Sequence, residues 1–321
     1  MTSTETFAAN SQCAGRFRSC ADLEGFTGDT FTITWNGGNN RSAVRRHCAL
    51  SNRPFFFRQI EVVAVGQGAG GAFELSGPGG TVPIIVQYRN PTGGSWVTLT
   101  PNTPRNFQSL TEAQFDICTS SGTNAGGQRL RIRIIDDDLE SVPAGTYTGR
   151  IRLTINAPFG AGTDTESSGL ITVVSPPLMN FIRLKNNFNF GVWDGFGSET
   201  NADTSVCVWT NNRPSVGAPA TYQVTAMTAE GAFEVLSGGS PPIPYSVYWA
   251  GSGGVSSIGS ATQLFYGAPQ QFTTTNDSEN CAGNSNNASM LVHFDESDLG
   301  AAQAAAGTYQ STVLIEVAIP P

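Results

Sequence analysis

Few residues in this sequence can do chemistry, and cysteine is the most informative of them. Six cysteines occur in 321 residues, together with only two histidines and a single lysine, Lys185. Zinc sites use close pairs such as Cys-x-x-Cys, completed by further cysteines or histidines. No such pair occurs here, and the cysteines are widely scattered. Scattered cysteines of this kind indicate disulfides and an oxidising compartment.

The side chains that catalysis requires form no recognisable arrangement. His47 lies between Arg46 and Cys48, and His293 lies in an apolar run, so neither belongs to a nucleophile motif. The acidic run 136–138 is a candidate Ca²⁺ site, but it lacks the spaced ligands and the glycine of a dedicated loop, which favours a solvated turn. We therefore predict no enzyme activity, no metal site and no cofactor.

Charge is distributed unevenly along the chain. Residues 1–176 carry fourteen arginines and fourteen acidic residues, whereas residues 177–321 carry three basic and eleven acidic residues, which gives the net charge of -8. No stretch combines basic residues with interleaved aromatic ones, so the sequence argues against nucleic-acid binding.

Composition indicates short strands broken by turns. The chain contains 37 Gly and 18 Pro, and Thr, Ser, Val and Ile occur in short runs between them. No apolar run approaches the length that spans a bilayer. Residues 1–10 lack the charged and apolar segments of a signal peptide. The cysteines nevertheless indicate export, so we expect that a leader has been removed.

The sequence contains an internal repeat. Matched features recur in the same order: Cys48 with 52–54 and Cys207 with 212–214; 71–74 and 231–234; 82–86 and 243–247; Pro104 with Phe107 and Pro269 with Phe272; 144–147 and 306–309. Each unit also has a tryptophan shortly before its first cysteine, Trp35 and Trp193. The repeat predicts two domains of one architecture, with boundaries at 1–176 and 177–321.

The cysteines follow the repeat. Cys48 and Cys118 are 70 positions apart, and Cys207 and Cys281 are 74 apart, so we pair them in that way. Each bridge would stabilise its domain by about 4 kcal/mol in the chain-entropy description. Two further cysteines, Cys13 and Cys20, have no counterparts in the second unit, and we expect a local bridge between them.

Apolar residues alternate within each unit. Examples are 60, 62 and 64; 84, 86 and 88; 130, 132 and 134; and 151, 153 and 155. Period-two segments at short spacing, separated by turn residues, indicate β-strands. The sequence therefore predicts an all-β protein of two tandem immunoglobulin-like β-sandwiches.

The two repeats differ at their ends. In the first, the expected strand 146–155 is followed by a turn, 156–164, and by a further strand, 169–174. In the second, the matching strand 308–317 is followed only by residues 318–321. We therefore expect the second domain to lack its last strand. An uncovered apolar surface and an unpaired sheet edge are both unfavourable in water, and a strand from another chain is the expected remedy.

The second unit resembles a known family. Residues 244–249, 269–274 and 306–317 are similar to the pilin domains of archaic (alternative) chaperone–usher pili, which are related to the spore coat protein U domain; the likeness covers most of 178–321. The resemblance implies an incomplete pilin-type fold that receives a strand from a periplasmic pilus chaperone and later from an adjacent pilus subunit. It also implies an outer-membrane usher as a partner.

The N-terminal residues narrow the expected position in the fibre. Residues 1–20 show no alternating apolar segment that could serve as a donor strand. The resemblance therefore implies a two-domain tip adhesin, secreted through the periplasm to the cell surface, that mediates bacterial attachment and biofilm formation. An interior pilus subunit and a free-standing secreted carbohydrate-binding β-sandwich protein are the alternatives. The receptor or surface bound is not encoded in any recognised motif.

Candidate binding residues follow from this reading. The donor-strand groove is expected to be lined by Phe188, Phe190, Val192, Val313, Ile315 and Val317. Phe159 lies in a Gly-rich turn and is a candidate contact residue of an adhesive tip loop, or it caps the sandwich. For the apolar run 55–57 and for Trp96, packing is favoured over a binding role.

Overall fold

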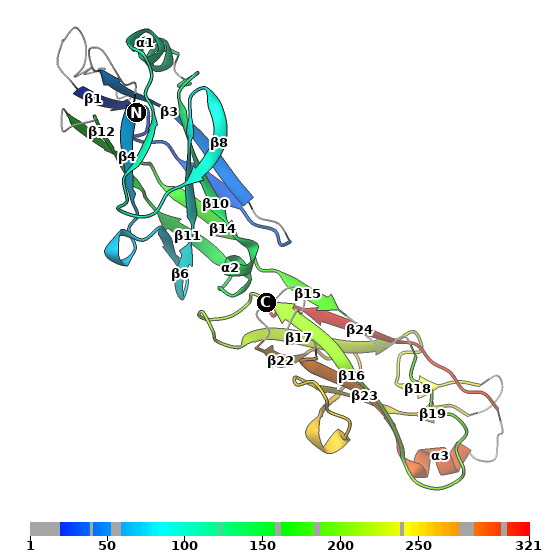
Figure 1. Cartoon of the computed structure of the whole chain (residues 1–321). Coiled ribbons are helices and arrows are strands. Elements are labelled where there is room, and N and C mark those ends of the chain that lie inside the picture. Colours follow the sequence, from blue (N-terminus) through cyan, green and yellow to red (C-terminus); the bar gives the residue numbers. More distant parts are fainter. Residues whose placement is uncertain are drawn as a thin grey trace, which may run out of the picture. The chain divides into compact units, whose positions relative to one another are not determined.

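The computed structural model describes residues 20–321 apart from 39–40, 53–58, 122, 158–161, 183–186, 238–240, 276–285 and 303–306 (Figure 1). The chain divides into two compact units. Unit 1 comprises Met1–Leu139 and Gly145–Pro176, and unit 2 comprises Glu140–Ala144 and Pro177–Pro321. Both units are built mainly from β-sheets, which confirms the predicted all-β class. Among the described residues, no helix is long and apolar enough to cross a membrane.

The strands of the first part of the chain are short. They are β1 (Cys20–Glu24), β2 (Phe31–Thr34), β3 (Arg41–Asn52), β4 (Gln59–Val65), β5 (Glu74–Gly77), β6 (Gly80–Pro83), β7 (Ile85–Asn90), β8 (Gly93–Thr98), β9 (Arg105–Gln108), β10 (Gln128–Ile134), β11 (Gly145–Gly149), β12 (Arg152–Asn156), β13 (Thr163–Ser167) and β14 (Ile171–Ser175), with helices α1 (Glu112–Ser120) and α2 (Asp136–Glu140).

The described residues of unit 1 form three sheets. Their strand orders are β1-β3-β10-β7-β8, β2-β14-β11-β5-β6 and β13-β12-β4-β9. The apolar rows that the alternation predicted are buried in all cases, for example Ile132 on β10, Val62 on β4 and Leu153 on β12. The period of two therefore determines which face of each strand enters the core.

The expected strand 146–155 is divided in the structure. Residues 145–149 form β11, which pairs with β14, whereas residues 152–156 form β12, which pairs with β4 and β13. The chain thus passes from one sheet to another at Arg150 and Ile151. Alternation alone did not reveal this change, because Ile151 remains buried and the apolar period is not interrupted.

Helix α1 was not predicted. It begins at a capping box, in which the Thr111 hydroxyl accepts from the backbone N–H of Gln114 and the Gln114 side chain accepts from the backbone N–H of Thr111. The helix packs on the outer face of β3, where Phe115 joins a small cluster with Leu50 and Leu110.

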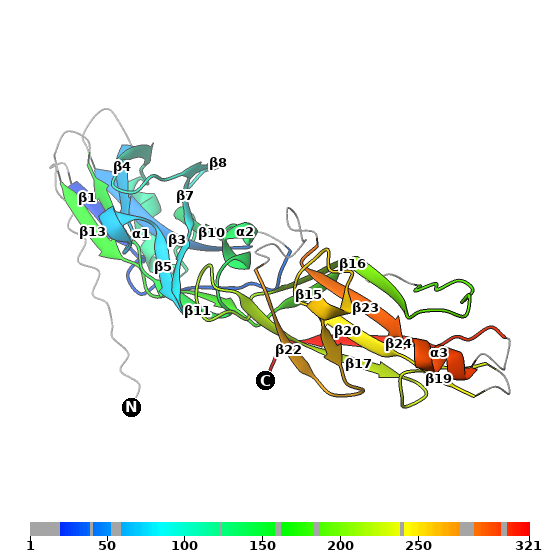
Figure 2. The same cartoon turned by 90° about the horizontal axis from the view of Figure 1, so that it is seen from below.

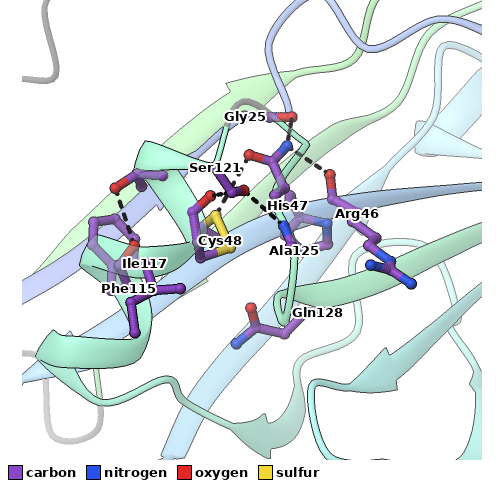
Figure 3. Close-up of a disulfide and its surroundings, with 12 residues drawn as sticks. Gly25, Arg46, His47, Cys48, Phe115, Ile117, Ser121, Ala125 and Gln128 are labelled. Carbon is purple, nitrogen blue, oxygen red and sulfur yellow. Dashed lines mark hydrogen bonds between the residues drawn. A yellow bond between two sulfur atoms is a disulfide. The ribbon is translucent and has the colours of Figure 1, made fainter.

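The disulfide between Cys48 and Cys118 joins this helix to β3, as predicted (Figure 3). Beneath it, the Gln128 side chain accepts from the backbone N–H of Ala49 and donates to the carbonyl of the same residue. Cys207 is also disulfide-bonded, but its expected partner Cys281 lies outside the described residues. Cys13 lies outside them too, and Cys20 begins β1.

Unit 2 repeats much of this arrangement. Its elements are β15 (Met179–Ile182), β16 (Glu199–Thr210), β17 (Ala220–Thr228), β18 (Glu234–Val235), β19 (Ile243–Pro244), β20 (Ser246–Ala250), β21 (Thr262–Leu264), β22 (Gln270–Thr274), β23 (Ala288–Phe294), α3 (Glu296–Ala302) and β24 (Val313–Ala318). The strand orders are β15-β16-β23-β20-β21, β22-β17-β24 and β18-β19. Figure 2 shows unit 2 in a second view, with β24 in red.

The core of unit 2 lies between these sheets. It includes Val208 on β16, Tyr222 on β17, Trp249 on β20 and Met290 on β23, all fully or almost fully buried. The Trp249 indole N–H donates to the Tyr222 hydroxyl at 3.0 Å, so the largest side chains of the core are also joined by a hydrogen bond. Further apolar residues pack against this core while remaining partly exposed.

Candidate strand-acceptor site

Strand β24 lies at the edge of its sheet. It pairs antiparallel with β17, and the order β22-β17-β24 places it last. Among the described residues no strand pairs with its second edge. An unpaired edge leaves backbone N–H and C=O groups available to another strand.

The counterpart of β24 in unit 1 is β12, and the two have the same register. Leu153 of β12 lies opposite Ala64, and Ile315 of β24 lies opposite Ala226. Both members of the second pair are 162 positions after those of the first, which is also the separation of Tyr147 and Tyr309 in the sequence repeat. The two strands can therefore be compared residue by residue.

Burial differs at these matched positions. Ile151, Leu153 and Ile155 are fully buried in unit 1. Their counterparts Val313, Ile315 and Val317 pack against the core of unit 2 but are only partly buried. Because backbone register and side-chain type are alike, the difference lies in what covers the strand.

In unit 1 two later strands provide that cover. Strand β13 pairs with the second edge of β12. Strand β14 lies between β11, to which it is antiparallel, and β2, to which it is parallel, and its Ile171 and Val173 side chains are fully buried. The described residues of unit 2 include no counterpart of either strand.

The segment that matches β2 is not a strand in unit 2. In unit 1, β2 pairs in parallel with β14. Directly after β2, the backbone N–H of Trp35 donates to the carbonyl of Val174 at 2.9 Å. In unit 2, residues 187–198 contain no strand. The indole N–H of Trp193, the counterpart of Trp35, donates to the nearby carbonyl of Gly197.

This difference corrects one of the predicted groove residues. Phe188 and Phe190 pack against the core of unit 2 and remain partly exposed. Val192, which we predicted beside them, is 96% exposed and takes no part in that packing. A segment with no neighbouring strand has no ladder to keep its side chains alternating, which explains why Val192 turns away.

Aromatic residues that sequence reasoning missed lie beside this row. Phe190 contacts Phe294 edge to face, with ring centroids 4.9 Å apart. Tyr245 lies 5.6 Å from Phe294, and its hydroxyl is 3.2 Å from the hydroxyl of Ser311. Tyr309 also packs against the same core. The alternation of apolar residues in 290–294 could have identified Phe294. The match of Tyr147 with Tyr309 in the repeat could have identified Tyr309.

The side chains beside β24 are mainly apolar. Burial raises the pKa of Tyr245, and the hydrogen bond to Ser311 opposes that rise. Phe188, Phe190, Val313, Ile315 and Val317, which pack against the same core, have apolar side chains. We call Phe188, Phe190, Tyr309, Val313, Ile315 and Val317, together with the open edge of β24, the acceptor site.

Other candidates from the sequence fall elsewhere. Phe159 and the run 55–57 lie outside the described residues. Trp96 lies on β8, half-buried, beneath the guanidinium of Arg131. The acidic run 136–138 begins α2. Within the described part of the chain, no group of three or more histidine, cysteine or acidic residues could hold a metal ion.

No family model matches the sequence. No curated protein matches it either. A solved structure of the CsuC–CsuE chaperone–tip adhesion subunit complex from the archaic chaperone–usher Csu pili of Acinetobacter baumannii contains a similar chain. The identity is 13%, the match covers 93% of this chain and 100% of that chain, and the TM-score is 0.44.

Two further solved structures are tip or adhesive subunits. The CupB6 tip adhesin from Pseudomonas aeruginosa is 11% identical, with 95% of this chain and 96% of that chain covered and a TM-score of 0.36. CfaE, the adhesive subunit of CFA/I fimbria of enterotoxigenic Escherichia coli, is 11% identical, with 92% and 93% covered and a TM-score of 0.36.

Proposed function

We propose that unit 2 accepts a β-strand from another polypeptide and that this attaches the chain to a pilus of the chaperone–usher type. In this proposal a periplasmic chaperone supplies the strand first and an adjacent pilus subunit supplies it after passage through the outer-membrane usher. Unit 1, which contains its own covering strands, is the part that meets a surface. The chain would then serve as a tip adhesin at the cell surface, in attachment and biofilm formation.

One observation carries the proposal. Two strands of identical register, β12 and β24, present equivalent apolar rows, and only the first row is fully buried. Partly exposed apolar side chains beside an unpaired edge provide both contributions to strand addition, namely main-chain hydrogen bonds and pockets for alternate side chains. The pilin-like segments 244–249, 269–274 and 306–317 agree with the same role.

The position of the incoming strand follows from unit 1. There β14 is antiparallel to β11 and parallel to β2. In unit 2 the backbone of Gln310 is paired with Leu236 on one side, as Thr148 of β11 is paired with Ser76 of β5. The other side of residues 309–311 is therefore the expected place for a donated strand, with Phe188 and Phe190 beyond it.

The test uses a peptide with the sequence of residues 163–176, which contains β13 and β14 of this chain; in unit 1 these strands pair with β12 and β11. Added to the full-length protein, it should protect the backbone amides of β24 from hydrogen exchange and raise the unfolding temperature of unit 2. The control is the same peptide with Ile171→Asp and Val173→Asp, which removes the alternating apolar side chains. Strong protection, in the free monomeric protein, of those β24 amides that do not bond to β17 would contradict the proposal and favour a free-standing binding protein.

A further inference from the structure

The outer face of the sheet β1-β3-β10-β7-β8 carries a cluster of arginines. On β10, Leu130 and Ile132 point into the core and are fully buried, so Arg129, Arg131 and Arg133 lie on the opposite face. The neighbouring strands contribute Arg46 from β3 and Arg89 from β7 to the same face. We call these five residues the arginine face.

Strand pairing brings three of these arginines into one line. Arg129 lies directly opposite Arg46 on one side and directly opposite Arg89 on the other. Paired positions in a sheet have Cβ atoms about 4.5–5.5 Å apart, and like charges in that arrangement are destabilising. Arg131 and Arg133 follow at two-residue steps along β10, each about 6–7 Å further on. The face thus presents repeated positive charge in two directions.

Among the described residues, none of the five arginines forms an ion pair with a carboxylate. Burial lowers the pKa of Arg131, and the neighbouring charges of Arg133 and Arg89 lower it further, as expected for a group surrounded by like charge. The Nε atom of Arg89 is buried and has no hydrogen-bond partner. The fold alone therefore leaves a repulsion that a bound anion would relieve.

Neighbouring residues hold the central arginine in place. The Arg131 guanidinium donates from Nε and Nη2 to the side-chain oxygen of Gln87, whose amide in turn donates to the Thr98 hydroxyl at 3.0 Å. It also lies over the ring of Trp96, 4.4 Å from the centroid. Arg89 lies 5.8 Å from the same ring. Orientation by buried or stacked partners reduces the entropy lost when a guanidinium binds an anion.

We infer that the arginine face binds an acidic polysaccharide. Guanidinium groups match the planar or tetrahedral oxygens of carboxylate and sulfate with paired hydrogen bonds, and a polymer can meet several of these groups at once. Single-stranded nucleic acid is a poorer fit, because its bases stack on open aromatic rings and Arg131 covers the ring of Trp96. This inference concerns unit 1 and does not depend on strand acceptance by unit 2.

The test measures binding of the full-length chain to immobilised heparin across a series of salt concentrations. The variant Arg129→Gln/Arg133→Gln leaves the contacts of Arg131 intact and should weaken binding roughly tenfold or more, with a shallower salt dependence. The control Arg105→Gln/Arg152→Gln removes the same charge from exposed positions on β9 and β12 and should bind as the unaltered chain does. The whole chain carries a net charge of -8, so general charge does not favour heparin.

Three results would overturn the inference. They are an unchanged affinity of the arginine-face variant, an equal loss in the control, and binding of single-stranded DNA as tight as that of heparin through the same arginines. Thermal unfolding gives a second readout, since the variant relieves like-charge repulsion and should unfold at an equal or higher temperature. If that variant does not fold, Arg46→Gln at the exposed end of the line replaces it and should weaken heparin binding about threefold.

Discussion

A pair of matched substitutions tests whether β24 lacks a covering strand. Leu153→Ala and Ile315→Ala each remove three carbons at equivalent positions of β12 and β24. At about 0.8 kcal/mol for each buried carbon, full burial of three carbons corresponds to about 2.4 kcal/mol. The cavity left beneath a covering strand adds to this, so Leu153→Ala should destabilise unit 1 by about 3 kcal/mol.

The same change in β24 should have a smaller effect. Ile315 is only partly buried, and an open side leaves no enclosed cavity, so Ile315→Ala should destabilise unit 2 by about 1 kcal/mol in the free chain. The remaining 2 kcal/mol, roughly, should appear when a strand binds, as a thirtyfold loss of affinity for the peptide 163–176.

The assay is urea unfolding of the full-length chain, combined with hydrogen exchange of the β12 and β24 amides to assign each effect to its unit. Leu314→Ala is the control, because Leu314 lies on the same strand but is 60% exposed, and its loss should change stability by less than about 0.5 kcal/mol. If Ile315→Ala costs the free chain as much as Leu153→Ala does, β24 is already covered and the reasoning is refuted.

Three further predictions concern unit 1. His47 is fully buried, and burial lowers its pKa to about 3, so its contribution to the stability of unit 1 should fall as pH drops below 6.5, by about 2.7 kcal/mol at pH 4.5; the difference in stability between the parent chain and His47→Gln should change with pH by that amount, and a constant difference would contradict it. Replacing Cys48 and Cys118 by alanine should cost about 4 kcal/mol for a bridge that spans 70 positions, measured by thermal unfolding, and a shift below about 1 kcal/mol would be inconsistent with the chain-entropy account. Burial raises the pKa of Glu166 to about 7, so the contribution of Glu166 has the opposite sign to that of His47 and should fall as pH rises from about 4.5 to 7; the difference in stability between the parent chain and Glu166→Gln in urea titrations should shrink over this range, and a constant difference would exclude Glu166 as a source of pH dependence.

Much of the fold was accessible from the sequence because its signals are local and repeated. The alternation of 60, 62 and 64 and of 130, 132 and 134 identified core-facing rows that are buried in the structure. The repeat identified β24 as the counterpart of β12 in the second unit, and the two strands pair with their neighbours in the same register. Cys48–Cys118 followed from the same comparison. Each of these depends only on spacing along the chain.

Other features depend on neighbours that the sequence does not specify. Val192 continues the alternation of Phe188 and Phe190, but alternation persists only where a neighbouring strand maintains it, so Val192 is exposed. The arginine face was hidden because no continuous stretch is basic; it forms only when strand pairing places Arg46 and Arg89 beside Arg129. Helix α1 was missed although Thr111 and Gln114 have the spacing of a capping box.

The covalent attachment of β14 has a consequence for the behaviour of the two units on dilution. A tethered segment has an effective concentration in the millimolar range at its own binding position, whatever the amount of protein in solution. Under the proposed function the acceptor site of unit 2 is filled by a separate polypeptide, so its occupancy follows the free concentration of that donor. Unit 1 should therefore unfold at the same temperature at every protein concentration. The unfolding temperature of unit 2 should rise with the logarithm of the donor concentration.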